Sequence, residues 1–522
     1  MNMNRMSKRL TLAAGCALLM VHAAVRANNA QVSNIALADS DTGYTHITCD
    51  VGWDNSWRVS WTETTPSITL TNWDAAWVFV KFRVATNNAP WQHASLSTNK
   101  ANHSVPAGAA LDVGLTSTRG IGVFLYRSDE GSGSWTNTLK LRWEYALDGV
   151  SKTDKVDVSV LAIEMVYVPQ GSFKVGSGGT ESGSFTAGPW VSGATIPFVI
   201  TSEAALMITN AVGGLWGTSS SGNNTIGPTG VLATAYSKGY NAFYCMKYEI
   251  TQGQWVDFFN MLTDSQKNNR DITGGTYNNT GKGTDLATNL NTIAWTTGDA
   301  ICTTPNRACN FLSWDDGVAY ADWAGLRPMT ELEFEKACRG PVEPVAEEYA
   351  WGKATAIADG GDGTINLTAA EDGTETNMTS VALGACVYGD NNIRVSGTNV
   401  GKGPVRGGLF ATANSTRITS GATYWGIMEM SGNLYEQVVS AGHNTGRLFT
   451  GTTGDGTLDQ NGYAHYGSWP NATATGAGFR GGDWVYGFAN AKVSNRNLGT
   501  RAYNARSSNH GFRAVRQESS CR

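Results

Sequence analysis

The first third of the chain alternates apolar and polar residues in short runs. Turn residues separate these runs, of which 58–61, 77–82, 122–126 and 139–143 are examples. A period of two residues is typical of β-strands with one buried face. The pattern predicts an all-β sandwich over residues 31–160.

Helical patterns begin only beyond residue 160. Residues 251–262 place aromatic and aliphatic side chains at helical spacing. Two capping boxes, each followed by a glycine that ends a helix, predict two further short helices. Residues 341–517 are rich in Gly, Thr and Asn, which favours long ordered loops. The capping pairs and terminating glycines are Ser313 with Asp316 and Gly325, and Thr330 with Glu333 and Gly340.

The composition and the net charge of the chain exclude some classes of function. Apolar residues make up 41 % of the chain and charged residues only 16 %, so a large core is available. The formal net charge is −5, without the basic excess of a nucleic-acid-binding protein, and we expect no nucleic-acid partner. The five tryptophans between residues 53 and 77 form either the sandwich core or a sugar-stacking platform, and the core is the favoured interpretation.

Residues 1–27 have the pattern of a secretory signal peptide. Basic residues at 5, 8 and 9 precede an apolar stretch, and small residues stand at 25 and 27. No other apolar run approaches the ~20 residues of a membrane span. We therefore expect a secreted, periplasmic or cell-surface protein with no transmembrane span after cleavage. The alternatives are a short membrane anchor and a lipid anchor at Cys16.

The chain has eight cysteines, and cleavage after residue 27 would remove one of them. The remaining odd number leaves at least one thiol outside any disulfide within the chain. No CxxC motif is present, which excludes a zinc ribbon. Cys302 and Cys309 are close enough in sequence to close a small loop, but the pairing stays open.

A series of motifs in order resembles the formylglycine-generating enzyme family, also called the sulfatase-modifying-factor domain. The resemblance implies an α+β fold, a C-type-lectin-like domain over residues 161–517 that follows the sandwich. The motifs are 164–173 (EMVYVPQGSF), 242–251 (AFYCMKYEIT), 313–320 (SWDDGVAY), 326–335 (LRPMTELEFE), 349–352 (YAWG), 432–436 (GNLYE), 480–484 (RGGDW) and 511–513 (GFR).

The residues that imply catalysis in this family are replaced. The family's oxidases bind Cu(I) through two cysteine thiolates, because this soft metal prefers sulfur. The corresponding positions are Tyr486 and Ala491, and Asp483 replaces the usual serine. No histidine pair has the H-x₃-H spacing of the family's iron-dependent branch. We expect neither copper nor iron, and a catalytically inactive protein; an oxidoreductase with a divergent site is the alternative.

A structural Ca²⁺ site is implied by the same resemblance. By register its ligands are the carboxylates of Glu429 and Glu436 and the carbonyls of Gly432 and Leu434. These are hard oxygen donors, as Ca²⁺ requires. If Glu436 is instead paired with an arginine, the turn closes without metal.

Residues 480–513 have the composition of a binding surface. Tyr, Asn and Ser dominate between scaffold residues such as Arg480, Trp484 and Arg513, as they do in antibody contact loops. The segment resembles the variable region of proteins diversified by retroelements. The prediction is recognition of a protein or glycan ligand on another cell, phage or host surface, through a diversified or a fixed segment; a structural cell-surface module is the alternative. The predicted ligand contacts are Asp483, Tyr486, Phe488, Asn490, Asn495, Asn497, Tyr503, Asn504, Asn509 and His510.

Overall fold

The computed structural model describes most of the 522-residue chain. The predicted signal peptide lies outside the described residues apart from 6–11, and so do Cys16 and Cys521. The described residues are 6–11, 30–85, 89–116, 118–191, 195–219, 222–274, 281–354, 357–358, 364–367, 384–390, 392–395, 398–411 and 415–518.

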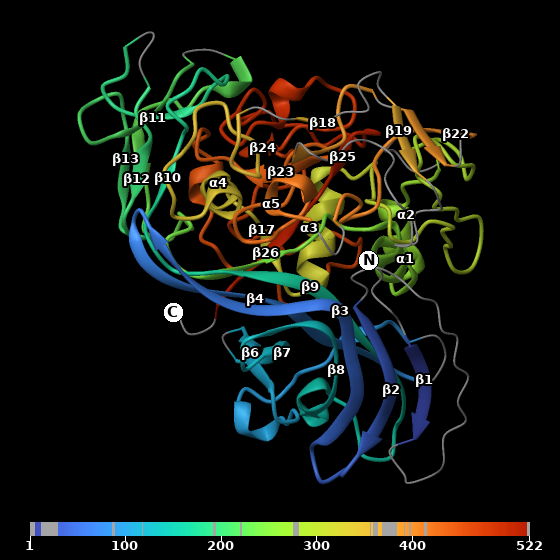
Figure 1. The fold of residues 1–522 in the computed structure, drawn as a ribbon. Helices are drawn as coiled ribbons and strands as arrows, with labels where there is room; N and C mark the ends of the chain where they lie inside the picture. The colour runs from blue at the N-terminus through green and yellow to red at the C-terminus, as the bar shows by residue number, and fades with distance from the viewer. Residues whose placement is uncertain are drawn as a thin grey trace.

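One 12-stranded sheet runs through the molecule (Figure 1). Its strands are β1 (Met6–Thr11), β2 (Gln31–Ala38), β3 (Thr45–Thr64), β4 (Ser67–Val84), β5 (Gln92–His93), β6 (Ala109–Leu115), β7 (Gly120–Arg127), β8 (Gly131–Trp143), β9 (Lys155–Val168), β16 (Phe243–Met246), β17 (Arg327–Pro328) and β26 (Ala514–Gln517). The main path is β17-β26-β16-β9-β4-β3-β2, and the other strands pair onto it. Residues 45–58 of β3 pair with β8, and part of this stretch also pairs with β2. Residues 58–64 of β3 pair with β4, which in turn pairs with β7 and β9.

β9 joins the two predicted domains. The boundary predicted between residues 160 and 161 falls inside this strand. Its residues 156–166 pair with β4, and residues 165–168 pair with β16. The two predicted domains, residues 31–160 and 161–517, therefore contribute strands to one sheet.

β4 is buried on both faces. Val78 and Val80 lie in one hydrophobic cluster with the strands β2, β3 and β8. Trp77 and Phe79 lie in a second cluster with the helices of the C-terminal part. Because side chains alternate between the faces of a strand, one apolar run supplies two cores.

Five α-helices lie among the described residues, and two of them carry the predicted caps. They are α1 (Gln252–Asn260), α2 (Asp264–Arg270), α3 (Trp314–Trp323), α4 (Glu331–Arg339) and α5 (Arg417–Ser420). Ser313 and Thr330 cap α3 and α4 through complete capping boxes, which confirms the predicted starts. α2 was not predicted, although Thr263 and Gln266 form the same box. Short 3₁₀ helices are η1 (Lys100–Asn102), η2 (Tyr145–Asp148), η3 (Gly222–Asn224), η4 (Gly446–Leu448) and η5 (Phe488–Ala491).

Small sheets complete a mixed α/β fold that is mostly sheet with few helices. In the described part of the chain, no helix is long and apolar enough to cross a membrane. The small sheets are β10 (Phe173–Val175) with β12 (Phe198–Ile200); β11 (Phe185–Ala187), β14 (Leu215–Gly217), β13 (Leu206–Ile208) and β15 (Gly230–Leu232); β18 (Ile357–Ala358) with β20 (Gly384–Ala385); β19 (Thr364–Leu367), β21 (Asn392–Val395) and β22 (Thr398–Lys402); and β24 (Ala477–Arg480), β23 (Tyr435–Val439) and β25 (His510–Gly511).

The tryptophans of the N-terminal strands belong to the interior. Trp53, Trp73 and Trp77 are buried. Trp57 and Trp61 are half-buried and pack against a cluster of the C-terminal part. The sandwich-core interpretation is therefore confirmed for Trp53 alone, because Trp73 and Trp77 lie in the hydrophobic cluster that includes the C-terminal helices. Trp57 and Trp61 join the two parts of the chain.

Candidate functional site

A three-stranded sheet brings together three motifs that are far apart in sequence. β23 lies between β24, which is antiparallel to it, and β25, which is parallel. Glu436 stands opposite both Arg480 and Gly511 in this sheet. The Gly432 N–H also donates to the Gly481 carbonyl at 2.7 Å. The GNLYE, RGGDW and GFR motifs thus form one face of the fold.

Gly481 and Gly482 close the loop that follows β24. Both have positive φ, +85° and +71°, a region that favours glycine. A Cβ on Gly482 would lie 2.7 Å from the Ala491 nitrogen, so a side chain here would collide with the backbone. The glycine pair therefore holds residue 491 against the start of the loop.

The two positions that the family resemblance aligns with copper ligands carry no sulfur. Tyr486 is 51 % exposed, whereas Ala491 is 1 % exposed and packs in a cluster with Cys386 and Tyr388. Cys386 comes from a distant loop and is the one thiol of that cluster. The six cysteines that the structure describes form no disulfide with one another. Two thiolates, as the family's copper site uses, are not assembled by these residues.

The residues of the expected Ca²⁺ site are buried. Glu429 accepts a hydrogen bond from the Gly408 N–H at 2.7 Å through Oε1. Arg513 donates to Glu436 Oε1 at 2.9 Å from Nε. The second oxygen of each carboxylate has no hydrogen-bond partner among the described residues. Two orphaned buried oxygens are what a bound cation would satisfy, so the donor set fits Ca²⁺ even though Glu436 is paired with an arginine.

Electrostatics around this turn also favour a cation. Burial raises the pKa of Glu429 to about 7. Glu249 lies nearby, and burial raises its pKa well above the usual range. Glu249 accepts hydrogen bonds from Leu434 N–H and the Asn433 amide. Of these three buried carboxylates, Glu436 pairs directly with Arg513, whose charge also opposes the rise in the pKa of Glu249 and Glu429.

Some predicted ligand contacts reach the surface. Tyr486, Phe488 and Asn497 are exposed, Phe488 by 53 %. Asn490 and Tyr503 are half-buried. These five residues, called the aromatic face below, remain available to a partner.

Four of the other predicted contacts are buried, which corrects their expected role. Both oxygens of Asp483 accept hydrogen bonds within the chain, from Val485 N–H and Tyr486 N–H and from the Asn509 amide. Burial raises the pKa of Asp483 to about 6. Asn495 donates to the Ala489 carbonyl at 3.0 Å. These side chains shape the loop.

The fourth buried contact is His510. Its ring packs 4.6 Å from Phe479 and 5.4 Å from Tyr503, centroid to centroid. Burial lowers the pKa of this histidine to about 4, so the ring is neutral at physiological pH. Asn504 is half-buried and donates to Asp315 Oδ2 at 2.8 Å. Both side chains therefore make contacts within the chain, and His510 packs against Tyr503 of the aromatic face.

A buried ion network supports the loop. Arg480 donates to Glu331 at 3.1 Å and to Glu335 at 2.7 Å, and Arg339 donates to Glu335 at 3.0 Å. Arg496 also pairs with Glu331. The scaffold role predicted for Arg480 is confirmed, as it is for Trp484, which is buried, and for Arg513.

The sequence analysis missed two aromatic residues behind the face. Tyr388 lies 6.1 Å from Phe488, and Tyr435 lies 6.2 Å from Tyr486, centroid to centroid. Tyr435 belongs to the GNLYE motif, but Tyr388 lies nearly one hundred residues before Phe488 in the chain. No local signal identifies such a long-range neighbour.

A second possible metal-binding group was also missed. Asp322, Asp455 and His465 each offer a ligand atom within 4.8 Å of the others. His465 Nδ1 is 3.7 Å from Asp322 Oδ2 and 3.9 Å from Asp455 Oδ1. The H-x₃-H pattern does not identify this group, because it holds one histidine and because Asp322 belongs to α3, far in sequence from Asp455 and His465.

Comparison with known protein families decides the assignment. The model of the sulfatase-modifying factor enzyme 1-like domain matches residues 151–518. The chain belongs to this family. The match begins before residue 161, so it includes all of β9.

Two curated members match short stretches. The formylglycine-generating enzyme of Thermomonospora curvata is 46 % identical over 55 residues, which is 10 % of this chain and 18 % of that enzyme. The formylglycine-generating enzyme of Streptomyces coelicolor is 48 % identical over 48 residues, which is 9 % of this chain and 15 % of that enzyme. The chain therefore aligns with less than a fifth of either relative.

Proposed function

We propose that this family member is not a copper oxidase and that it recognises a partner through the aromatic face. One observation carries the proposal: the two ligand positions are an exposed Tyr486 and a buried Ala491 methyl group. An exposed phenol offers contact area, and a methyl group offers no metal ligand.

The chemistry of the aromatic face suits recognition of a protein or a glycan. Tyr486 and Phe488 are large side chains held by a compact loop, so their binding costs little conformational entropy. Asn490 and Asn497 add amides that donate and accept hydrogen bonds. We place this partner on another cell, a phage or a host surface, because the predicted signal peptide directs the chain to an exported, periplasmic or cell-surface location.

Oxygen consumption with a cysteine-containing sulfatase peptide tests the absence of oxidase activity. The chain is loaded with Cu(I), and the Streptomyces coelicolor enzyme serves as the positive control. We expect neither aldehyde formation nor stoichiometric copper binding. Turnover together with copper binding would establish the alternative, an oxidase with a divergent site.

Binding by the aromatic face is tested with a double variant, Tyr486→Ala with Phe488→Ala. Glycan arrays and intact bacterial and phage particles are probed with the labelled chain and with the variant. We expect the variant to lose the signal and to keep its melting temperature, because both side chains are largely exposed. Equal binding by both proteins would refute the role of this face and favour a structural surface module.

We also propose a structural Ca²⁺ ion in this protein. Glu429 and Glu436 would supply carboxylate oxygens, and Gly432 and Leu434 would supply carbonyls. The orphaned oxygens described above support this proposal. The ion would stabilise loops that the hydrogen bonds of a β-sheet do not hold in place.

A further inference from the structure

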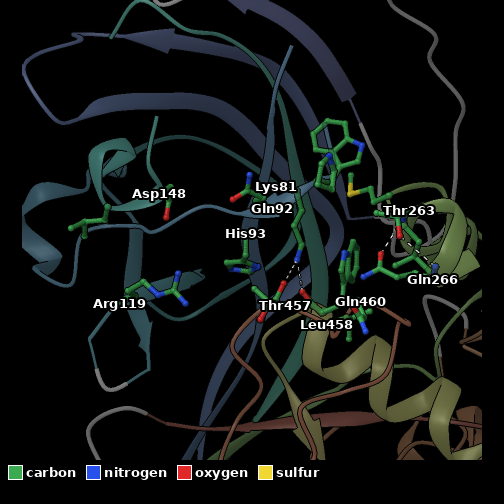
Figure 2. Close-up of a pocket in the computed structure, with 17 residues that line it drawn as sticks. Lys81, Gln92, His93, Arg119, Asp148, Thr263, Gln266, Thr457, Leu458 and Gln460 are labelled. Atoms are coloured by element: carbon green, nitrogen blue, oxygen red, sulfur yellow. Dashed lines mark hydrogen bonds between the residues drawn. The ribbon is translucent and has the colours of Figure 1, made fainter. Parts of the chain in front are cut away.

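A cavity of about 580 Å³ lies where the N-terminal strands meet the helices of the family domain (Figure 2). β4, β5, η2 and Arg119, which directly precedes β7, line one side, and residues 261–263 between α1 and α2, α2, α3 and residues 456–460 line the other. None of its lining residues belongs to the aromatic face or to the expected Ca²⁺ site. The size is that of a small-molecule site.

Two basic side chains line this cavity. Lys81 is buried, and its amine donates to the Trp323 and Gly456 carbonyls at 2.7 Å each, as the dashed lines in Figure 2 show. Burial lowers the pKa of Lys81 well below its usual range, which favours the neutral amine, so Arg119 is the cation of the cavity. Arg119 is half-buried, and the structure shows no hydrogen bond or ion pair for its guanidinium among the described residues.

The structure shows no ion pair between Arg119 and another described residue of the cavity wall. Asp148 is the one carboxylate among the lining residues. It accepts from Ser95 N–H, Ser95 Oγ–H and the Trp143 indole at 2.6–2.8 Å. His93 is neutral, because burial lowers its pKa well below the usual range.

Apolar side chains occupy the rest of the wall. Leu147 lies at the wall of the cavity and is 67 % exposed. Trp91 and Leu458 are half-buried, and Met261 is buried. A ligand with an apolar body would cover these surfaces and gain hydrophobic free energy.

We propose that this cavity binds a small organic oxyanion, a carboxylate or phosphate ester with an apolar body, whose charged group contacts Arg119 and whose body contacts Leu147 and Trp91. The site is independent of the aromatic face. It places a small-molecule ligand between the N-terminal strands and the family domain.

Isothermal titration of the full chain tests the proposal. The probes are phenylacetate, phenyl phosphate and phenylacetamide, the last of which keeps the shape of phenylacetate without its charge. We expect saturable 1:1 binding of at least one anion, and weaker binding of the amide by about tenfold or more. The two anions distinguish a carboxylate ligand from a phosphate ligand.

Three variants locate the binding. Arg119→Gln removes a charge that has no partner in the structure, and Leu147→Trp fills the cavity edge from an exposed position. We expect each to weaken anion binding by about tenfold. Lys152→Gln removes an exposed charge outside the cavity and should leave binding unchanged. No saturable binding of either anion at millimolar concentration, equal binding of acid and amide, or full binding by both cavity variants would overturn the proposal.

Discussion

Trp77 and Val78 are neighbours in β4, yet they lie in different hydrophobic cores. The Trp77 indole donates to the Ala324 carbonyl at 2.8 Å, just beyond the end of α3. Val78 lies in the cluster with β2, β3 and β8. One strand therefore couples the stability of the N-terminal strands to that of the family domain.

The first prediction concerns the size of this coupling. Trp77→Ala should lower the free energy of unfolding by about 3–5 kcal/mol, because it empties a buried site and orphans the Ala324 carbonyl. Val59→Ala in β3 is the control, since Val59 is 42 % exposed, and it should cost well under 1 kcal/mol, roughly the surface value. Denaturant titration measures both. Similar losses of unfolding free energy in the two variants would contradict a role of β4 in both hydrophobic cores.

The second prediction concerns truncation at the predicted boundary. A chain of residues 161–522 lacks β4 and the first half of β9, so it would expose one face of the remaining sheet. We expect it to be insoluble or to lack a cooperative melting transition. The chain from residue 28 onward should melt in one transition. A soluble, cooperatively folded 161–522 fragment would contradict the shared-core arrangement.

The third prediction concerns the buried ion network. Although burial opposes it, Arg496 and Arg480 hold the pKa of Glu331 below its usual value. Glu331→Ala would leave these guanidinium groups with too few acceptors and should cost about 3–5 kcal/mol of stability. Glu343→Ala is the matched control, because its pair with Lys174 is exposed and contributes at most about 1 kcal/mol. Denaturant titration at pH 7 compares the two variants.

The fourth prediction joins Ca²⁺ to pH. The pKa of Glu429 is about 7 in the folded chain, above its ordinary value of 4.5, so the metal-free protein should lose stability as pH rises between these values. Ca²⁺ requires the deprotonated carboxylate and should therefore raise the melting temperature more at pH 8 than at pH 6.

Thermal melts with Ca²⁺ and with a chelator at both pH values measure this effect. Glu429→Gln should abolish the Ca²⁺ response and should stabilise the chelated protein at pH 8. A melting temperature that chelation leaves unchanged at pH 8 would refute the Ca²⁺ site.

The fifth prediction concerns diversification. If a retroelement diversifies this chain, codons for residues 480–513 should vary across a cell population only at adenine positions of a template. Codons for 313–340 serve as the control and should be invariant. The variable codons should include those of the exposed Tyr486 and Phe488 and should spare those of the buried Arg480 and Trp484. If the codons of both segments are equally invariant, diversification is excluded, and the proposed recognition would involve one fixed partner.

The sequence by itself determined the local features and the family. The capping boxes at Ser313 and Thr330 involve contacts within four residues, so they are legible without any tertiary information. That Tyr and Ala stand at 486 and 491, the positions that the resemblance aligns with copper ligands, is likewise read from residue type alone. The motifs alone indicated the family, and the match of the family model to residues 151–518 confirmed it.

Only the tertiary structure decided which residues of the 480–513 segment face solvent. Asp483 and Asn509 have the composition of contact residues, but they bond to each other inside the loop. The shared role of β9 and the cavity at Lys81 also depend on strands and helices that meet from distant parts of the chain. Burial is set by such long-range packing, whereas propensity and capping act within a few residues; for this reason the pattern predicted the elements but not their surroundings.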